Sequence, residues 1–350
     1  MSSTTAARLI DWESAARMGS RFAGTGPSIT PADRARLHED FADVVAEADR
    51  EVAGFTGLAL QGPATRPWVM TRAEWVSRNL RGFESVLEPV AQRVLGSRLQ
   101  GTMAPVRRSV LAFQVGAILG YLGRKVLGQY DLFVPPDDRE LLYFVGPNVV
   151  EVERQFRFPP RDFRLWLSLH EVTHRLQFEG VPWLRAYLFD LVDEYLATLE
   201  FDPRRLIDGL RRALEEARSS GRWREMGILF LLMSPQQRET FQKMQALMSL
   251  LEGHGNYVMD SLAEGRVADA GRMRRRLKER RQQGMNRTLQ RAVGLDAKVR
   301  QYDIGERFVA RAVERAGMDG FSKVWAARDN LPTLAEIGQP DAWVERVASG

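Results

Sequence analysis

The chain has 350 residues, of which 44% are hydrophobic and 27% are charged. This composition is typical of a globular protein with a packed core, and it excludes a largely disordered or collagen-like chain. The absence of cysteine excludes disulfides, thiolate metal ligands and a cysteine nucleophile.

The charge balance does not identify a partner. The net charge is +5, from 50 basic and 45 acidic residues, and only five of the basic residues are lysine. Acidic and basic residues are interleaved along the chain, so bulk charge does not predict nucleic-acid binding. The N-terminus has no apolar segment typical of a secretion signal, and the longest apolar run, 109–123, is too short to span a bilayer. We therefore expect a cytoplasmic protein with no membrane contact.

Helical periodicity dominates the first third of the chain. A helix is predicted over 30–52, with Pro31 in its first turn, where proline is tolerated. A second is predicted from Thr71 to residue 87, ending before Pro89, and it starts with a capping box in which Thr71 and Glu74 satisfy each other's backbone. A third covers 105–127, and its glycines and alanines suit close helix packing.

The pattern changes over 130–152, where short aromatic and β-branched runs alternate with Pro-Pro and Gly-Pro pairs. Such runs are typical of short strands, so we expect two or three strands here and helices again after Pro160. The predicted fold class is mainly α with a small central β-sheet (α+β). Three regions are expected: a helical N-terminal region (1–128), a catalytic core (129–265) and a C-terminal helical region (266–350), which together could form one unit.

Two of the four histidines, His170 and His174, flank Glu171 in a His-Glu-x-x-His motif. The surrounding stretch lacks glycine and proline and is predicted to be helical. Residues four apart lie on one helix face, so both imidazoles can bind a single metal ion. Glu171 can then act as the general base for a metal-activated water without being a ligand. Four positions of this helix are expected to face the core: Leu169, Val172, Thr173 and Leu176.

A catalytic zinc site usually has three protein ligands, and segment 250–260 offers candidates for the third. Glu252 and His254 are two residues apart, so on a continuous helix they point in different directions, and only a break at the glycines would let both bind. We favour Glu252, because Asn256 then lies one turn later on the same face and can orient a ligand. His254 is the alternative ligand, or acts with Tyr257 as a hydrogen-bond donor to the transition state.

These motifs resemble the glutamate-ligand branch of the zincin metallopeptidases. More closely, the chain resembles a bacterial family of zincin-like hydrolases of unknown substrate. The matching segments are 10–12, 56–58, 146–148, 170–178, 252–255, 259–260 and 298–302. The resemblance implies a zincin-like metallopeptidase core with extra helices, and part of the family is labelled as associated with coenzyme F-420 biosynthesis. Related peptidases have Glu-x-x-x-Asp at the third ligand, whereas this chain has Asn256 in place of the aspartate.

The resemblance also implies how a substrate would bind. In zincins a strand before the motif helix lines the cleft and pairs with an extended substrate. The run 141–145 or 148–152 is in the right place to be that edge strand. A peptide or another amide-containing substrate is therefore expected.

A dense basic run lies after the third-ligand segment. Its members are Arg272, Arg274, Arg275, Arg276, Lys278, Arg280 and Arg281. No aromatic residues are interleaved with them, so a solvated helix face is favoured over a nucleic-acid surface.

The sequence therefore predicts a zinc metallohydrolase, a peptidase or amidase, with Zn²⁺ bound by His170, His174 and Glu252. Two alternatives remain. One is a metal-stabilised scaffold without turnover, and the other is a binder of nucleic acid or an acidic partner through Arg272–Arg281.

Overall fold

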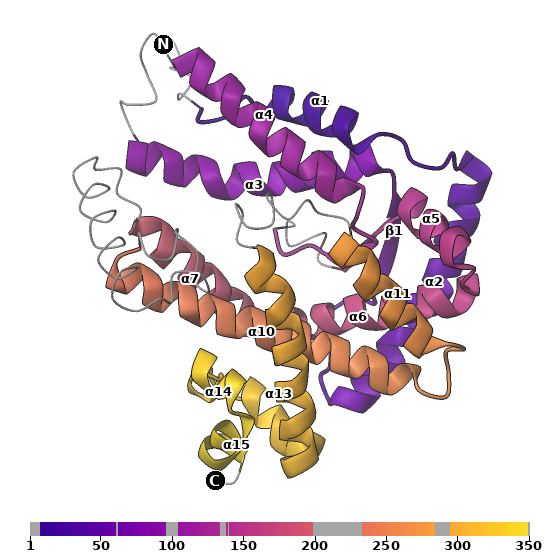
Figure 1. Cartoon of the computed structure of the whole chain (residues 1–350), viewed down its shortest axis with the longest axis vertical. Helices are drawn as coiled ribbons and strands as arrows, with labels where there is room; N and C mark the ends of the chain where they lie inside the picture. The colour runs from indigo at the N-terminus through magenta and orange to yellow at the C-terminus, as the bar shows by residue number, and fades with distance from the viewer. Residues whose placement is uncertain are drawn as a thin grey trace. The chain divides into compact units, whose positions relative to one another are not determined.

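The computed structural model describes residues 8–60, 62–95, 104–133, 138, 140–198, 233–283 and 295–348 (Figure 1). The chain divides into two compact units. The first comprises Met1–Arg50 and Gly62–Val172, and the second comprises Glu51–Gln61 and Thr173–Gly350. The division of the sequence into three regions stays a prediction.

Three helices of the first unit lie side by side (Figure 1). They are α1 (Trp12–Ala23), α3 (Arg72–Leu95) and α4 (Ala104–Gly123). Helices α1 and α4 approach each other at glycines: a Cβ atom added at Gly116 would lie 2.6 Å from the carbonyl oxygen of Ala15, and one at Gly120 would lie 2.6 Å from that of Gly19. The small residues of α4 therefore permit the close packing that the sequence predicts.

Helix α3 begins as expected but ends later. The backbone N–H of Thr71 donates to Glu74 and that of Glu74 donates to the Thr71 hydroxyl, which confirms the capping box. The prediction that the helix ends before Pro89 was wrong, because α3 continues to Leu95. Glu88, just before the proline, accepts hydrogen bonds from the backbone of Leu9 and from the Trp12 indole. These long-range contacts hold the turn in place although the proline cannot donate its own helical hydrogen bond.

The sheet of the first unit has three strands in the order β1-β3-β2. Strand β3 (Leu141–Val145) pairs in parallel with β1 (Arg66–Met70) and antiparallel with β2 (Gly128–Tyr130). The sequence did not predict β1. Residues 148–152, expected to be extended, lie in helix α5 (Gly146–Phe156), because Pro147 occupies the first helical turn, where its missing N–H costs nothing.

This arrangement corrects the expected substrate-binding edge. β3 is the central strand, with hydrogen bonds on both sides, and residues 148–152 are helical. Neither run can therefore serve as an open edge. The edge strands of the described sheet are β1 and β2.

Helix α2 (Pro31–Thr56) precedes the three strands in the sequence, and α5 follows them. Helix α2 confirms the helix predicted over 30–52. Phe41 of α2 stacks on Phe144 of β3, with ring centroids 3.9 Å apart. Both side chains are fully buried, so α2 is held to the sheet by an apolar contact at its centre.

The second unit is built on a helix crossing. Helix α10 (Pro235–Ala263) crosses and packs against α13 (Leu295–Ser322) (Figure 1). Helix α7 (Leu184–Ala197) also contacts α10. Helix α11 (Ala270–Gln283) follows α10 in the chain. At the crossing, a Cβ atom added at Gly253 would overlap the backbone of Gly305 and lie 2.6 Å from the backbone nitrogen of Glu306.

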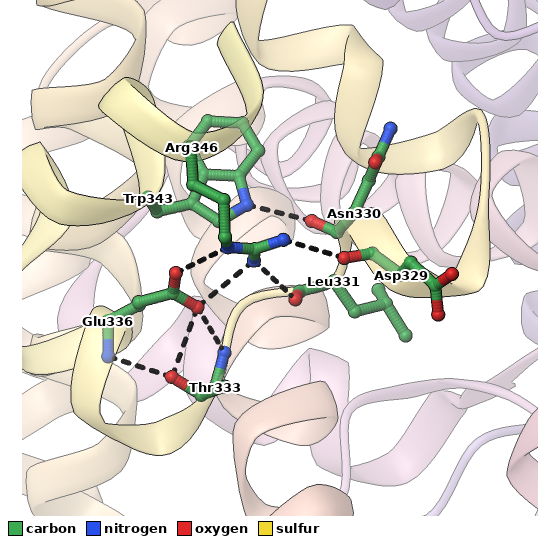
Figure 2. Close-up of polar contacts among 7 residues, drawn as sticks. All are labelled: Asp329, Asn330, Leu331, Thr333, Glu336, Trp343 and Arg346. Atoms are coloured by element: carbon green, nitrogen blue, oxygen red, sulfur yellow. Dashed lines mark hydrogen bonds and ion pairs between the residues drawn. The ribbon is translucent and has the colours of Figure 1, made fainter.

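Hydrogen bonds from Arg346 hold the last segments of the second unit together (Figure 2). After the 3₁₀ turns Lys323–Trp325 and Arg328–Asn330 come α14 (Leu334–Gly338), α15 (Pro340–Trp343) and the π turn Val344–Ala348. The Arg346 guanidinium donates to both Glu336 oxygens, at 2.6 and 3.1 Å, and to the backbone carbonyls of Asp329 and Leu331. One side chain therefore joins three separate segments.

The fold is mainly α with a small sheet, as predicted. None of the described helices is long and apolar enough to cross a membrane.

Candidate metal centre

The His-Glu-x-x-His motif lies on α6 (Pro160–Gly180), as the sequence predicts. The helix begins at a proline and has Asp162 in its first turn, where a carboxylate is favoured by the helix dipole. All four residues expected to face the core are buried, with relative exposures of 1% or less: Leu169, Val172, Thr173 and Leu176. This apolar stripe fixes the rotation of α6 and so the direction in which the motif residues point.

A single helix carries both histidines. The boundary between the two units falls inside α6, between Val172 and Thr173, and α6 is continuous across it. His170 and His174 are therefore spaced by one helical turn on the same face.

Glu252 completes a group of three potential ligands. One nitrogen from each histidine and one oxygen from Glu252 lie within 4.8 Å of one another. Nε2 of His174 lies 3.8 Å from Oε2 of Glu252. The three residues are half-buried rather than fully exposed. Two imidazole nitrogens and one carboxylate oxygen are a donor set that zinc accepts, so these residues fit the metal expected from the sequence.

Helix α10 positions Glu252 without any break. Ser234 and Gln237 form a capping box at its start, and Pro235 occupies its first turn. The glycines around Glu252 do not interrupt the helix. Instead, Gly253 allows α13 to approach so closely that a side chain there would overlap the Gly305 backbone. Glu252 therefore lies beside a tight helix crossing that limits how far it can move.

Glu171 is held by the edge strand β2. The backbone N–H of Tyr130 donates to Oε2 of Glu171 at 3.1 Å, and the side chain is 7% exposed. Any side chain at Gly128 would meet this glutamate, because a Cβ atom there would lie 2.8 Å from its Cγ. The sheet thus fixes the orientation of the carboxylate next to the first histidine.

Gln177 lies one turn after His174 and is fully buried. Its Nε2 lies 3.2 Å from the backbone oxygen of Leu251 and 2.8 Å from Nδ1 of His254, and its Oε1 lies 3.0 Å from Nδ1 of His174. No motif in the sequence predicted a role for Gln177. A usable signal was present, since a polar residue one turn after the motif and beside the buried Leu176 needs internal hydrogen-bond partners.

His254 points away from the three grouped residues. It is fully buried, and its ring lies 5.3 Å from that of Phe321 and 5.4 Å from that of Trp325. Burial, together with the nearby His174, lowers the pKa of His254 to about 3. The imidazole is therefore neutral at physiological pH.

Asn256 and Tyr257 of this segment are both half-buried. Tyr257 contacts Phe55, with ring centroids 6.3 Å apart. Asn256 makes no hydrogen bond within the described parts of the chain, whereas Gln177 contacts the candidate ligand His174. The positioning role expected of Asn256 stays a prediction. The roles of His254 and Tyr257 in the reaction stay predictions.

The basic run lies on α11 and part of it is already paired. Arg274 forms ion pairs with Asp260, at 2.6 Å, and with Glu306. Arg276 pairs with Glu279 at 3.0 Å and Arg272 with Asp269 at 3.3 Å. The side chain of Arg281 lies outside the described residues. These pairs lower the positive charge that the run presents to a partner.

A cavity of about 330 Å³ lies elsewhere in the first unit, between α2, α5 and the start of α6. Arg164 in its wall donates to Glu153 at 2.8 and 2.9 Å and also binds Asp40. The buried charges there neutralise one another, and none of the candidate site residues lines the cavity.

Comparisons with known proteins identify a family and a similar solved structure. A family model described as a zincin-like metallopeptidase matches residues 10–344. A crystal structure from Chloroflexus aurantiacus, described as a candidate hydrolase with a novel fold, is 31% identical. The match covers 97% of this chain and 98% of that one, with a TM-score of 0.73. No curated protein matches the chain. The association with coenzyme F-420 synthesis stays a prediction.

Proposed function

The chain belongs to the family of zincin-like metallopeptidases, and from this premise we propose that it is a zinc-dependent hydrolase of peptide or amide bonds. The observation that carries the proposal is the group of His170, His174 and Glu252, whose donor atoms lie within 4.8 Å of one another. Three protein ligands leave one position of a tetrahedral site open, which is the arrangement of catalytic rather than structural zinc.

His170, His174 and Glu252 would hold the metal. Zinc in such a site acts as a Lewis acid that activates water and polarises the scissile carbonyl. The same donor set also accepts cobalt, nickel or manganese, and zinc is the choice favoured by the family.

Glu171 is the proposed general base. It follows the first ligand directly in α6, and its carboxylate is oriented by the backbone N–H of Tyr130 at 3.1 Å. A carboxylate with a fixed orientation can accept the proton of the attacking water and later deliver it to the leaving nitrogen. His254 and Tyr257 were expected to stabilise the transition state, and the complete burial of His254 argues for a supporting role instead.

The first test is metal analysis of protein purified without chelator or nickel affinity. We expect about one zinc per chain in the wild type, and loss of zinc in His170→Ala, His174→Ala and Glu252→Ala. His254→Phe keeps an aromatic ring in the pocket and should retain zinc. Loss of zinc in His254→Phe with retention in Glu252→Ala would move the third ligand to His254 and contradict the proposed set.

The second test concerns the base. Glu171→Gln should retain zinc while cleavage of a peptide or amide library falls by about 10²–10⁴-fold, because the amide cannot accept the proton. Glu179→Gln is the matched control on the same helix, where Glu179 pairs with Arg185 at 2.6 Å, and it should keep activity. Zinc binding without cleavage by the wild type would favour a metal-stabilised scaffold.

A further inference from the structure

The side chain of Gln177 connects a candidate ligand to a buried histidine that the proposed mechanism does not use. All three hydrogen bonds of its amide group lie within the second unit. Gln177 and His254 are both inaccessible to solvent, with 0% exposure. Buried polar groups usually have hydrogen-bond partners, and the three hydrogen bonds of the Gln177 amide strongly constrain its arrangement.

The orientation of the Gln177 amide follows from one contact. The backbone oxygen of Leu251 can only accept a hydrogen bond, so the atom 3.2 Å from it must be the NH₂ group of Gln177. That NH₂ group also faces Nδ1 of His254 at 2.8 Å. Nδ1 of His254 is therefore an acceptor, which places the ring proton on Nε2.

The opposite end of the amide then fixes His174. With its NH₂ group engaged, Gln177 presents Oε1 to Nδ1 of His174 at 3.0 Å. An amide oxygen can only accept, so Nδ1 of His174 carries the proton. The lone pair of His174 is thereby on Nε2, which is the atom 3.8 Å from Oε2 of Glu252. The ring has the tautomer and the direction that a ligand at this position needs.

We propose that Gln177 is a positioning residue for the metal site: it holds His174 in the Nδ1-protonated tautomer, and His254 with the Leu251 carbonyl fixes the Gln177 amide. This inference rests on the proposed function, because it assigns His174 as a ligand. Partners that accept the distal N–H of a ligating histidine orient its ring and raise its basicity. His254 acts on the metal through Gln177 and not by binding it.

Burial of the Nε2 side of His254 is consistent with this assignment. Nε2 of His254 is buried and has no hydrogen-bond partner among the described residues. The ring packs against Phe321 and Trp325 instead. Leaving the Nε2–H of a buried histidine unsatisfied costs free energy. The nitrogen of His254 that forms a hydrogen bond is therefore Nδ1, which faces Gln177.

The decisive measurement is the nitrogen NMR spectrum of the imidazoles in protein labelled with ¹⁵N-histidine. The chain has four histidines, so the spectrum can be assigned with single substitutions. In the metal-free wild type we expect His174 to be protonated on Nδ1 and His254 on Nε2. The opposite tautomer at His174 would overturn the proposal, whatever the variants do.

Zinc affinity supplies the second readout. Gln177→Leu removes the acceptor and should weaken zinc binding by about 10–100-fold, the usual cost of losing such a partner. Gln242→Leu makes the same substitution at an exposed position of α10 and should leave the affinity unchanged.

Equal zinc affinity in Gln177→Leu and wild type would overturn the proposal. Failure of the proposed function has a different signature. If the wild type takes up no zinc, the metal site itself is wrong, and the tautomer of His174 still decides whether Gln177 orients it. Circular dichroism of each variant verifies that it is folded.

Discussion

Each of the two units contains a pair of helices packed at glycines, but the two pairs serve different ends. In the first unit, Gly116 and Gly120 of α4 meet the backbone of α1. In the second, Gly253 of α10 meets Gly305 of α13. The α1–α4 pair carries none of the proposed ligands, whereas Gly253 stands between Glu252 and His254. The same kind of close helix contact can therefore serve stability alone or can also fix the position of a proposed ligand.

The largest effect is expected for Gly305→Ala. The added methyl group would overlap the backbone carbonyl of Ser249, and neither helix backbone can move aside cheaply. We expect a loss of unfolding free energy of about 3 kcal/mol or more, as for a severe overpacking change. Because α10 must shift, zinc binding should also fall. Denaturant unfolding measures the loss of stability, and zinc titration of the same preparation measures the loss of affinity. Unchanged zinc affinity in Gly305→Ala would contradict a role of the α10–α13 contact in positioning Glu252.

Gly120→Ala should separate stability from metal binding. Its methyl group would lie 2.6 Å from both the Gly19 carbonyl and Cβ of Phe22. The expected destabilisation is about 1–3 kcal/mol, because the nearest atoms lie at 2.6 Å here and at 2.0 Å from a methyl group at Gly305. Zinc affinity should equal that of the wild type. A loss of zinc in this folded variant would contradict the distinction between the two helix pairs.

Replacing Arg346 tests how much this side chain stabilises the segments that follow α13 and pack against it. Arg346→Met would break the bonds to Glu336 and to two backbone carbonyls (Figure 2). The side chain is 41% exposed, so solvent replaces part of what is lost and we expect about 1 kcal/mol. Faster hydrogen exchange after Ser322, with unchanged exchange in α1 and α4, is the expected pattern.

The contribution of the Arg346–Glu336 ion pair to stability should depend on pH. Burial disfavours the charge of Glu336, but its hydrogen bonds with Arg346 and Thr333 prevail and lower its pKa below the ordinary value of 4.5. A carboxyl with a depressed folded-state pKa stabilises the fold above 4.5, and that contribution is lost as the pH falls through the folded-state pKa. Glu336→Gln should therefore reduce stability at pH 7 and have less effect near pH 3, as measured by unfolding at both values. An equal effect at the two pH values would show that the charge of Glu336 plays no part.

The smallest effect, and the matched control for the comparison, is Gly54→Ala on α2. Nothing lies within 4 Å of the added methyl group, and the position is exposed and helical. Alanine has the better helix propensity, so stability should rise by about 0.5–1 kcal/mol. Destabilisation at Gly54 would mean that glycine replacement itself, and not the helix contact, causes the losses at Gly120 and Gly305.

Local signals in the sequence determined much of this protein. The helical period and the capping box of Thr71 and Glu74 located α2 and α3, and the buried stripe of α6 followed from spacing alone. The motif also brought His170 and His174 to one face, because helix geometry is a property of neighbouring residues. For the same reason, the opposite directions of Glu252 and His254 on an unbroken helix could be foreseen.

Tertiary contacts decided the rest. Strand β1 exists because β3 pairs with it, Pro89 lies inside α3 because Glu88 is anchored by the N-terminal segment, and 148–152 is helical although its residues favour a strand. The sequence allowed a helix break at the glycine beside Glu252, and in the structure this glycine is a contact surface for α13. Gln177 reaches His254 only because α10 packs beside α6 in the second unit. Each of these features depends on residues distant in sequence, whose proximity no local pattern encodes.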